Sequence, residues 1–188
     1  YVVPMMDVDN VANGGAGKEQ MTDDGQRADF NRSWDEEPHW AAVRAAKRLL
    51  RCLKAEHDIA AFFDMHSPWY PNTPSWHLPP NMREEGLRFA EAWSAELEAT
   101  GSGIQWRHRF GEPPTGTKAL SREPSLDMVS SGAYAASQLF DRPEGHLCIT
   151  IETAHWHDGY GTLITLDALR AYALALGRAL SKFVAAQA

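Results

Sequence analysis

The sequence contains only two cysteines, Cys52 and Cys148, among 188 residues. This count excludes a scaffold stapled by several disulfides, and the patterns around the two residues predict two buried thiols. No apolar run approaches the roughly 18 residues that a membrane-spanning helix needs. The longest, at residues 59–63 and 147–151, have the length of strands. Basic residues are fewer than acidic ones, 18 against 25, which gives a net charge of −7. A broad basic surface is therefore not expected, which argues against nucleic acid as a partner.

The start of the sequence has neither an initiator methionine nor the basic segment of a signal peptide. Residues 1–6 have the apolar composition of a strand, so we expect the chain to begin partway through a domain. The length of 188 residues suits a single domain with a sizeable core. These features leave the localisation open, with the cytoplasm favoured, and no membrane partner is expected.

Two segments show clear amphipathic periodicity. Between residues 38 and 57, apolar residues recur at helical spacing, and the basic ones, Lys47 among them, fall mostly on the opposite face. Gly101 ends a helix predicted over residues 83–99, and Thr165 is the expected N-cap of a last helix. The residues expected to be buried are Trp40, Val43, Ala46, Leu50 and Leu53 in the first segment and Leu166, Leu169, Ala173, Leu176, Leu180 and Val184 in the last.

The remaining segments complete an alternation of strands and helices. This alternation predicts an α/β fold with a mixed, largely parallel sheet flanked by helices. In such sheets, ligands bind beyond the carboxyl ends of the strands. Strands are expected at residues 1–6, 59–63, 104–110 and 147–151, a further helix at 125–139, and loops at 7–28, 68–80, 111–124 and 154–164.

Chemically useful side chains follow the long first loop and two of the predicted strands. An Asn-Arg pair can bind a carboxylate through a guanidinium fork and an amide donor. A histidine at one strand end can bind a metal, and a glutamate at a second strand end can activate water. Asp64 points to the same side of its strand as His66 and could orient it. The motifs are Asp29-Phe30-Asn31-Arg32, Asp64-Met65-His66-Ser67 and Ile151-Glu152-Thr153.

Each motif also has a plainer interpretation. His66 alone is better explained as a capping or core histidine, and the Asn-Arg pair as a turn beside a surface arginine. Glu152, at the end of a buried strand, needs a partner, a function or exposure at the sheet edge. The spacing of His155 and His157 would suit metal ligands, but in a loop it is more often without that function.

In combination, these motifs resemble the M14 family of zinc carboxypeptidases. The match runs in the family's order from a proline-bearing strand and loop at residues 3–7, through the Asn-Arg and Asp-x-His motifs, to residues 149–153. It covers most of the chain but only the downstream part of the family's domain. The resemblance implies a zinc-carboxypeptidase-like mixed sheet between helices, with residues 1–188 forming a partial catalytic domain.

The resemblance also implies a role for each motif residue. His66 would be the third zinc ligand, and Glu152 would be the general base and acid. Asn31 and Arg32 would bind the terminal carboxylate of the substrate. Asp29 would accept a hydrogen bond from a zinc-bound histidine, and zinc would be the cofactor.

The sequence departs from the family pattern in three ways. The family's His-x-x-Glu, which supplies the other two zinc ligands, does not occur, and we expect it in an upstream segment of the same domain. Gln20 lies where the family has an oxyanion-stabilising arginine, with Lys18 or Arg27 as substitutes. The family's mobile tyrosine has no clean match, since Met128 lies nearest by motif and Tyr134 is the nearest tyrosine.

Three functions are compatible with these motifs. The leading hypothesis is a zinc-dependent hydrolase of the metallocarboxypeptidase type, which releases C-terminal residues from peptides with a free carboxylate. The missing ligands and Gln20 favour a first alternative, a non-catalytic module that binds a carboxylate or peptide without metal. The second alternative is an amidohydrolase acting on N-acyl amino acids. Zinc stoichiometry separates the first two functions, and a panel of blocked dipeptides and acylated amino acids separates peptidase from amidohydrolase.

Overall fold

The structure is a computed structural model, and the residues that it describes fall into two compact units. The first unit comprises Tyr1–Ile59 and Ser121–Asp141, and the second comprises Ala60–Leu120 and Arg142–Ala188. Each unit has its own cluster of buried apolar side chains. The described residues are 1–3, 6, 12, 14, 31, 33–34, 40–66, 75–77, 82–101, 131–142, 144–152 and 163–187.

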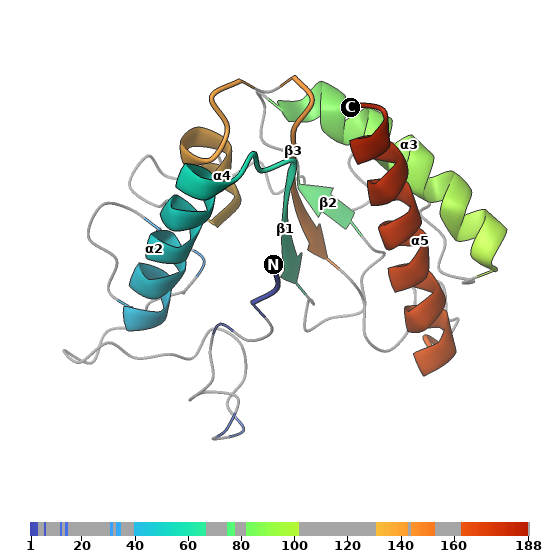
Figure 1. The fold of residues 1–188 in the computed structure, drawn as a ribbon. Helices are drawn as coiled ribbons and strands as arrows, with labels where there is room; N and C mark the ends of the chain where they lie inside the picture. The colour runs from blue at the N-terminus through green and yellow to red at the C-terminus, as the bar shows by residue number, and fades with distance from the viewer. Residues whose placement is uncertain are drawn as a thin grey trace, which may run out of the picture. The chain divides into compact units, whose positions relative to one another are not determined.

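The second unit contains a mixed sheet whose described strands have the order β1-β3-β2 (Figure 1). The strands are β1 (Ala61–His66), β2 (Ser75–His77) and β3 (Leu147–Glu152), with β3 between the other two. Strand β1 runs parallel to β3, and β2 runs antiparallel to it. The mixed sheet and the strands near residues 59–63 and 147–151 are thus confirmed. The loop predicted over residues 68–80 is wrong at β2, because three residues paired to a distant strand leave no pattern of their own.

Helices α3 (Arg83–Thr100) and α5 (Leu166–Ala185) lie side by side and pack with β3 (Figure 1). Alternate residues of β3 enter this core, since side chains on one face of a strand recur every second residue. Trp93 is fully buried, and its ring lies 4.8 Å from that of Tyr172, between centroids. The buried members of the cluster are Phe89, Trp93, Leu97, Leu147, Ile149, Ile151, Tyr172, Ala175 and Ala179.

The ends of these helices follow the sequence signals. Gly101 has a left-handed backbone with φ of 64° and donates its N–H to the carbonyl of Glu98, which ends α3. The Thr165 side chain accepts a hydrogen bond from the Ala168 N–H at 3.1 Å and caps α5. Both predicted boundaries are confirmed.

The buried side of α5 agrees with the predicted stripe only in part. Tyr172, Ala175 and Ala179 are buried, whereas Leu166 and Val184 are exposed. Small alanines let the backbone of α5 approach its neighbours closely, and Tyr172 gains a ring contact with Trp93. The prediction is therefore confirmed at Leu169, Leu176 and Leu180, which are partly buried and pack against the core, and is wrong at Ala173 and at the two ends of the stripe.

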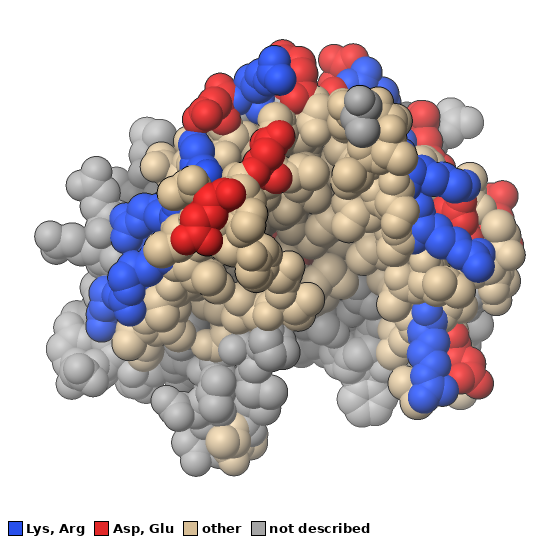
Figure 2. All heavy atoms as spheres, viewed as in Figure 1, with Lys and Arg blue, Asp and Glu red and all other residues tan. Residues whose placement is uncertain are grey.

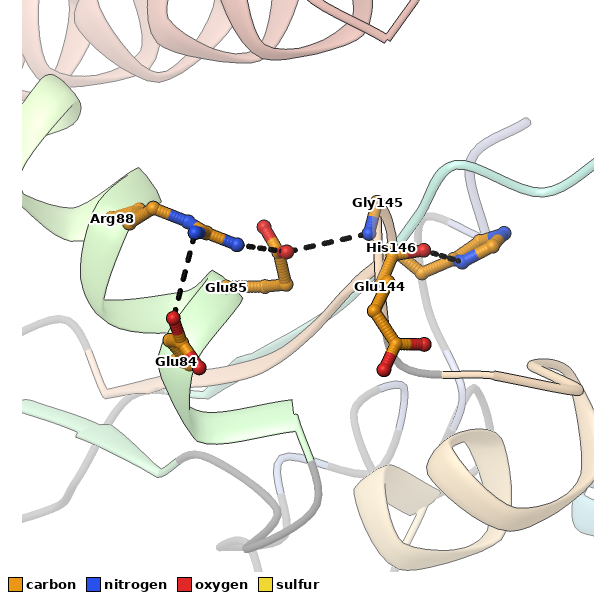
Figure 3. Close-up of polar contacts among 6 residues, drawn as sticks. All are labelled: Glu84, Glu85, Arg88, Glu144, Gly145 and His146. Carbon is orange, nitrogen blue, oxygen red and sulfur yellow. Dashed lines mark hydrogen bonds and ion pairs between the residues drawn. The ribbon is translucent and has the colours of Figure 1, made fainter.

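A tight turn precedes β3 and is tied to the start of α3 (Figure 3). The buried Glu85 carboxylate accepts hydrogen bonds from the Arg88 guanidinium and from the Gly145 N–H, the latter at 3.4 Å. His146 donates from Nδ1 to the carbonyl of Glu144 at 2.9 Å when that nitrogen carries the proton. These bonds hold the turn that immediately precedes β3.

The first unit contains α2 (Ala41–Glu56) and α4 (Ser131–Gln138), which confirm the helix near residues 38–57 and the described part of the helix predicted over 125–139. Trp34, Val43 and Tyr134 form its buried cluster. Lys47, predicted on the solvent face, is buried: its Nζ lies 4.8 Å from the centroid of the Tyr134 ring. A lysine stem is apolar, and the aromatic face stabilises the ammonium group, so this position accepts it.

Two further expectations in the first unit are wrong. Residues 1–3 and Met6 are not in a strand, and the side chains of Tyr1 and Val2 are exposed. Strand-forming residues make a strand only where a sheet edge is available for pairing. Cys52 is exposed on α2, whereas Cys148 is buried as predicted. The strand expected at residues 104–110 lies outside the described residues.

Charged side chains of both signs mix on the surface. On the face drawn in Figure 2, basic and acidic side chains lie next to one another over α3 and α5. Ion pairs on these two helices join Arg170 to Asp167, at 3.0 Å, and Lys182 to Glu96. None of the described helices is long and apolar enough to cross a membrane. The exclusion of nucleic acid as a partner stays a prediction.

Candidate functional site

The register of the sheet makes His66 and Glu152 neighbours. In the parallel pairing of β1 with β3, the Cα of His66 is matched with that of Glu152, and Asp64 with Thr150. Adjacent strands lie about 4.8 Å apart, so the two residues are separated by about one strand spacing. On its other side, Glu152 is matched with Ser75 of β2. Both predicted site residues therefore end neighbouring strands at the same edge of the sheet, although only the backbone of Glu152 is among the described features.

His66 and Asp64 interact on one face of β1. His66 Nε2 lies 2.8 Å from Asp64 Oδ2, and the two side chains are 28% and 20% exposed. The two-residue spacing on a strand predicted this common side. Since an ionised carboxylate only accepts, the bond places the proton of neutral His66 on Nε2 and the lone pair on Nδ1. A histidine held in one tautomer and one orientation is a better metal ligand or proton carrier than a mobile one.

A metal site is incomplete within the described part of the chain. There, no group of three or more His, Cys, Asp or Glu side chains is placed to hold an ion. A catalytic zinc takes three protein ligands and leaves one position for water or substrate. His66 contributes one imidazole, so the described residues alone do not fit a zinc ion.

Asn31 is held at the start of α4. Its Oδ1 accepts from the N–H and from the Oγ–H of Ser131, both at 2.7 Å. The two residues are 100 positions apart in sequence, and Ser131 is 5% exposed. Asn31 therefore acts as an N-cap supplied from outside the helix, which satisfies one of the donors that a helix leaves unpaired at its start.

The segment that follows Asn31 is also anchored. Lys47 Nζ donates to the carbonyl of Trp34 at 3.3 Å, and the Trp34 ring lies 5.6 Å from that of Tyr134, between centroids. The chain on both sides of Arg32 is thus fixed by α4 and α2 of the same unit. Arg32 and Asp29 themselves lie outside the described residues.

Of the other candidate site residues, Tyr134 is among the described residues and the rest lie outside them. Tyr134 is buried against Trp34, so its described position is structural rather than that of a mobile catalytic tyrosine. Ser131 was missed by the sequence reasoning. Its signal is the Ser-Ser-Gly that precedes the Ala-Tyr-Ala-Ala run, which is typical of a helix start. The candidates outside the described residues are Lys18, Gln20, Arg27, Met128, His155 and His157.

The mixed sheet and its covering helices define an α/β protein, and one solved structure shares its fold. No family model and no curated protein matches the sequence. The crystal structure of a metallo-carboxypeptidase from Burkholderia cenocepacia is similar to this chain, with a TM-score of 0.63 and 21% identity. The similarity covers 99% of this chain and 45% of that one, so the chain spans less than half of the neighbour's length. The fold is therefore of the metallo-carboxypeptidase kind.

Proposed function

We propose that the protein is a metal-dependent hydrolase of the metallocarboxypeptidase type, releasing C-terminal residues from peptides. The observation that carries the proposal is the register that matches His66 with Glu152 at the carboxyl ends of two parallel strands. Ligands of α/β proteins bind at that edge. The similarity in fold to a metallo-carboxypeptidase supports the same reaction class.

Within this proposal each residue has a chemical task. Glu152 takes a proton from the attacking water and returns it to the leaving amine. Asn31 and Arg32 bind the terminal carboxylate of the substrate, the arginine through its guanidinium fork. His66, oriented by Asp64, is one ligand of a zinc ion, and Asp29 orients another ligand. Zinc, when bound, would supply Lewis-acid polarisation of the scissile carbonyl.

The proposal assigns the two other zinc ligands to a segment outside this sequence. No His-x-x-Glu occurs among the 188 residues, and the neighbour of similar fold is more than twice as long as the part that matches. Residues 1–188 would then be a partial catalytic domain, completed by an upstream segment that acts as its structural partner.

A second function, binding of a carboxylate without catalysis, is favoured by one observation. The described residues contain no group of three side chains placed to hold a metal ion. A module of this kind would hold an acidic C-terminus through Asn31 and Arg32 and would need no zinc. Measured zinc stoichiometry of the complete protein separates the two functions.

The test compares Arg32→Ala with Glu152→Gln in the complete protein. Arg32→Ala is expected to raise KM, because it removes a charge-assisted contact worth about 1.5–3 kcal/mol. Glu152→Gln is expected to lower kcat by at least about 100-fold with little change in KM, because proton transfer operates in the transition state. Steady-state kinetics on blocked dipeptides and N-acyl amino acids gives both constants and identifies the substrate class.

Two exposed residues provide matched controls. Arg170→Ala removes an arginine from α5, and Glu84→Gln neutralises an exposed glutamate of α3. Both should leave kcat and KM unchanged. A Glu152→Gln variant with unchanged kcat would contradict the hydrolase, whereas carboxylate binding that depends on Arg32 without any turnover would establish the binding module.

A further inference from the structure

The orientation of the Asn31 amide is determined by its partners. A backbone N–H can only donate, so the atom of Asn31 that lies 2.7 Å from the Ser131 nitrogen must be the carbonyl oxygen. The Ser131 hydroxyl lies 2.7 Å from the same oxygen and donates to it as well. With Oδ1 engaged by two donors, rotation of the amide by 180° would bring an NH₂ group against an N–H. The two ends of the amide are therefore not interchangeable.

We propose that Ser131 is a positioning residue that orients Asn31 for binding the carboxylate of a substrate. This inference rests on the proposed function, in which Asn31 contacts that carboxylate. A carboxylate accepts hydrogen bonds and repels a carbonyl oxygen, so only the NH₂ end of Asn31 can serve it. By holding Oδ1 at the start of α4, Ser131 fixes which end of the amide accepts and makes the NH₂ group the end that donates.

The hydroxyl of Ser131 is the part of the arrangement that capping alone does not require. The bond from the Ser131 N–H to Asn31 Oδ1 is sufficient for capping, because it satisfies one backbone donor that the helix leaves unpaired at its start. The additional Oγ–H donation comes from a side chain that is 5% exposed, so it is held in place by its surroundings. Two donors from one residue restrict the amide more than a single bond would.

Asn31→Asp separates positioning from capping. Aspartate keeps an oxygen that accepts from Ser131, and a carboxylate is at least as good a cap as an amide because it also suits the helix dipole. The change replaces the NH₂ group with an anionic oxygen, which repels a substrate carboxylate. If Asn31 only caps α4, Asn31→Asp keeps both stability and ligand affinity. If Ser131 positions its NH₂ group, stability stays and affinity falls.

The experiment uses the complete protein in a Glu152→Gln background, so that no probe is cleaved. Two probes are compared by calorimetry: an N-blocked dipeptide with a free C-terminal carboxylate and the same dipeptide as its C-terminal amide. Asn31→Asp is expected to lower the affinity for the carboxylate probe by about tenfold or more, which is the usual effect of losing a hydrogen bond to a charged group. Ser131→Ala, which keeps the N–H donor, is expected to lower the affinity for the carboxylate probe by about threefold to tenfold. The affinity for the amide probe should change by less than a factor of about two.

Ser137→Ala is the matched control. Ser137 is exposed on the same helix, and its hydroxyl donates to the Tyr134 carbonyl rather than to Asn31. It should leave the affinities for both probes unchanged. In an Asn31→Ala background, Ser131→Ala should have no further effect on the ratio of the two affinities, because its effect acts through Asn31.

Each outcome decides the proposal. A lower carboxylate-to-amide ratio in both Asn31→Asp and Ser131→Ala, with an unchanged melting temperature in Asn31→Asp, supports it. An unchanged ratio in either variant overturns it and leaves Asn31 as a cap. If Ser131→Ala does not fold, Ser131→Cys, whose thiol is a weak donor of similar size, takes its place, and the same ratio decides. The protein that carries Glu152→Gln alone should bind the carboxylate probe more tightly than the amide probe. Equal affinities for the two probes would overturn the proposed function, and the positioning role with it.

Discussion

His66 and Asp64 form a polar pair on a strand that is otherwise built from apolar residues. The pair exists because residues two apart share a face of β1, and the carboxylate of one comes within 2.8 Å of the imidazole of the other. Met65, between them, points to the other side and is exposed. Polar groups grouped on one side of a strand end need either water or a ligand, which is why they lie at the edge of the sheet and not within it.

Asp64→Asn is predicted to change the tautomer of His66. The carboxylate favours the proton on Nε2, whereas a neutral amide exerts a weaker preference. Nitrogen-15 NMR of the neutral imidazole should therefore report Nε2–H in the unsubstituted protein and a mixture of tautomers in the variant. Under the proposed function, the variant of the complete protein is expected to lose about 10–100-fold in activity. Asp167→Asn, on the surface of α5, is the control, and an unchanged tautomer in Asp64→Asn would contradict the orienting role.

The helices and strands differ in how far the neighbouring sequence determines them. The C-terminal end of α3 and the N-cap of α5 could be predicted, because Gly101 and Thr165 act within one turn of chain. The strand β2 could not, since its three residues are specified by pairing with β3. The buried stripe of α5 depends on the neighbouring helix, which hydrophobic periodicity does not describe.

Alanine substitutions at two glycines are predicted to have opposite effects. A Cβ at Gly101 or at Gly177 would meet nothing within 4 Å, so neither change causes a clash. Gly101 has φ of 64°, a conformation that costs an alanine about 1–2 kcal/mol. Gly177 lies inside α5, where alanine is favoured by about 0.5–1 kcal/mol. Urea denaturation should show a lower free energy of unfolding for Gly101→Ala and a higher one for Gly177→Ala. Changes of the same sign would contradict the assigned backbone conformations.

The candidate site shows the same limit of local information. The sequence predicts that His66 and Glu152 follow strands, because both lie after apolar runs. It does not contain the register that matches them, which depends on the parallel pairing of β1 with β3. Ser131 could not be linked to Asn31 from the sequence, since a contact across 100 residues leaves no periodic signal.

At the scale of the whole molecule, one core residue is expected to dominate the stability of the second unit. Trp93 is fully buried between β3 and α5 in the cluster that joins them to α3. Trp93→Ala should lower the free energy of unfolding by about 3–5 kcal/mol. Leu174→Ala, on the exposed face of α5, should change it by less than about 0.5 kcal/mol. Far-ultraviolet circular dichroism in urea measures both, and similar losses would contradict the position of the core.

Zinc uptake by residues 1–188 alone is predicted to be well below one equivalent. A zinc site needs three protein ligands, and His66 is one. Metal analysis after dialysis against micromolar zinc is the measurement, with His57→Ala, an exposed histidine of the first unit, as the control for His66→Ala. A full equivalent that is lost in His66→Ala but retained in His57→Ala would contradict the prediction. It would indicate that His155 or His157 completes the site.

The matched strands also determine where the chain can tolerate changes in length. His66 and Glu152 belong to a ladder in which every Cα of β1 has a partner in β3. One residue inserted within either strand would turn the side chains beyond it to the opposite face, and the pair would be lost. Residues inserted between the strands leave the ladder intact and cost little, because loop closure depends only weakly on length. Variants of this sequence can therefore acquire longer loops while the two strands keep their lengths.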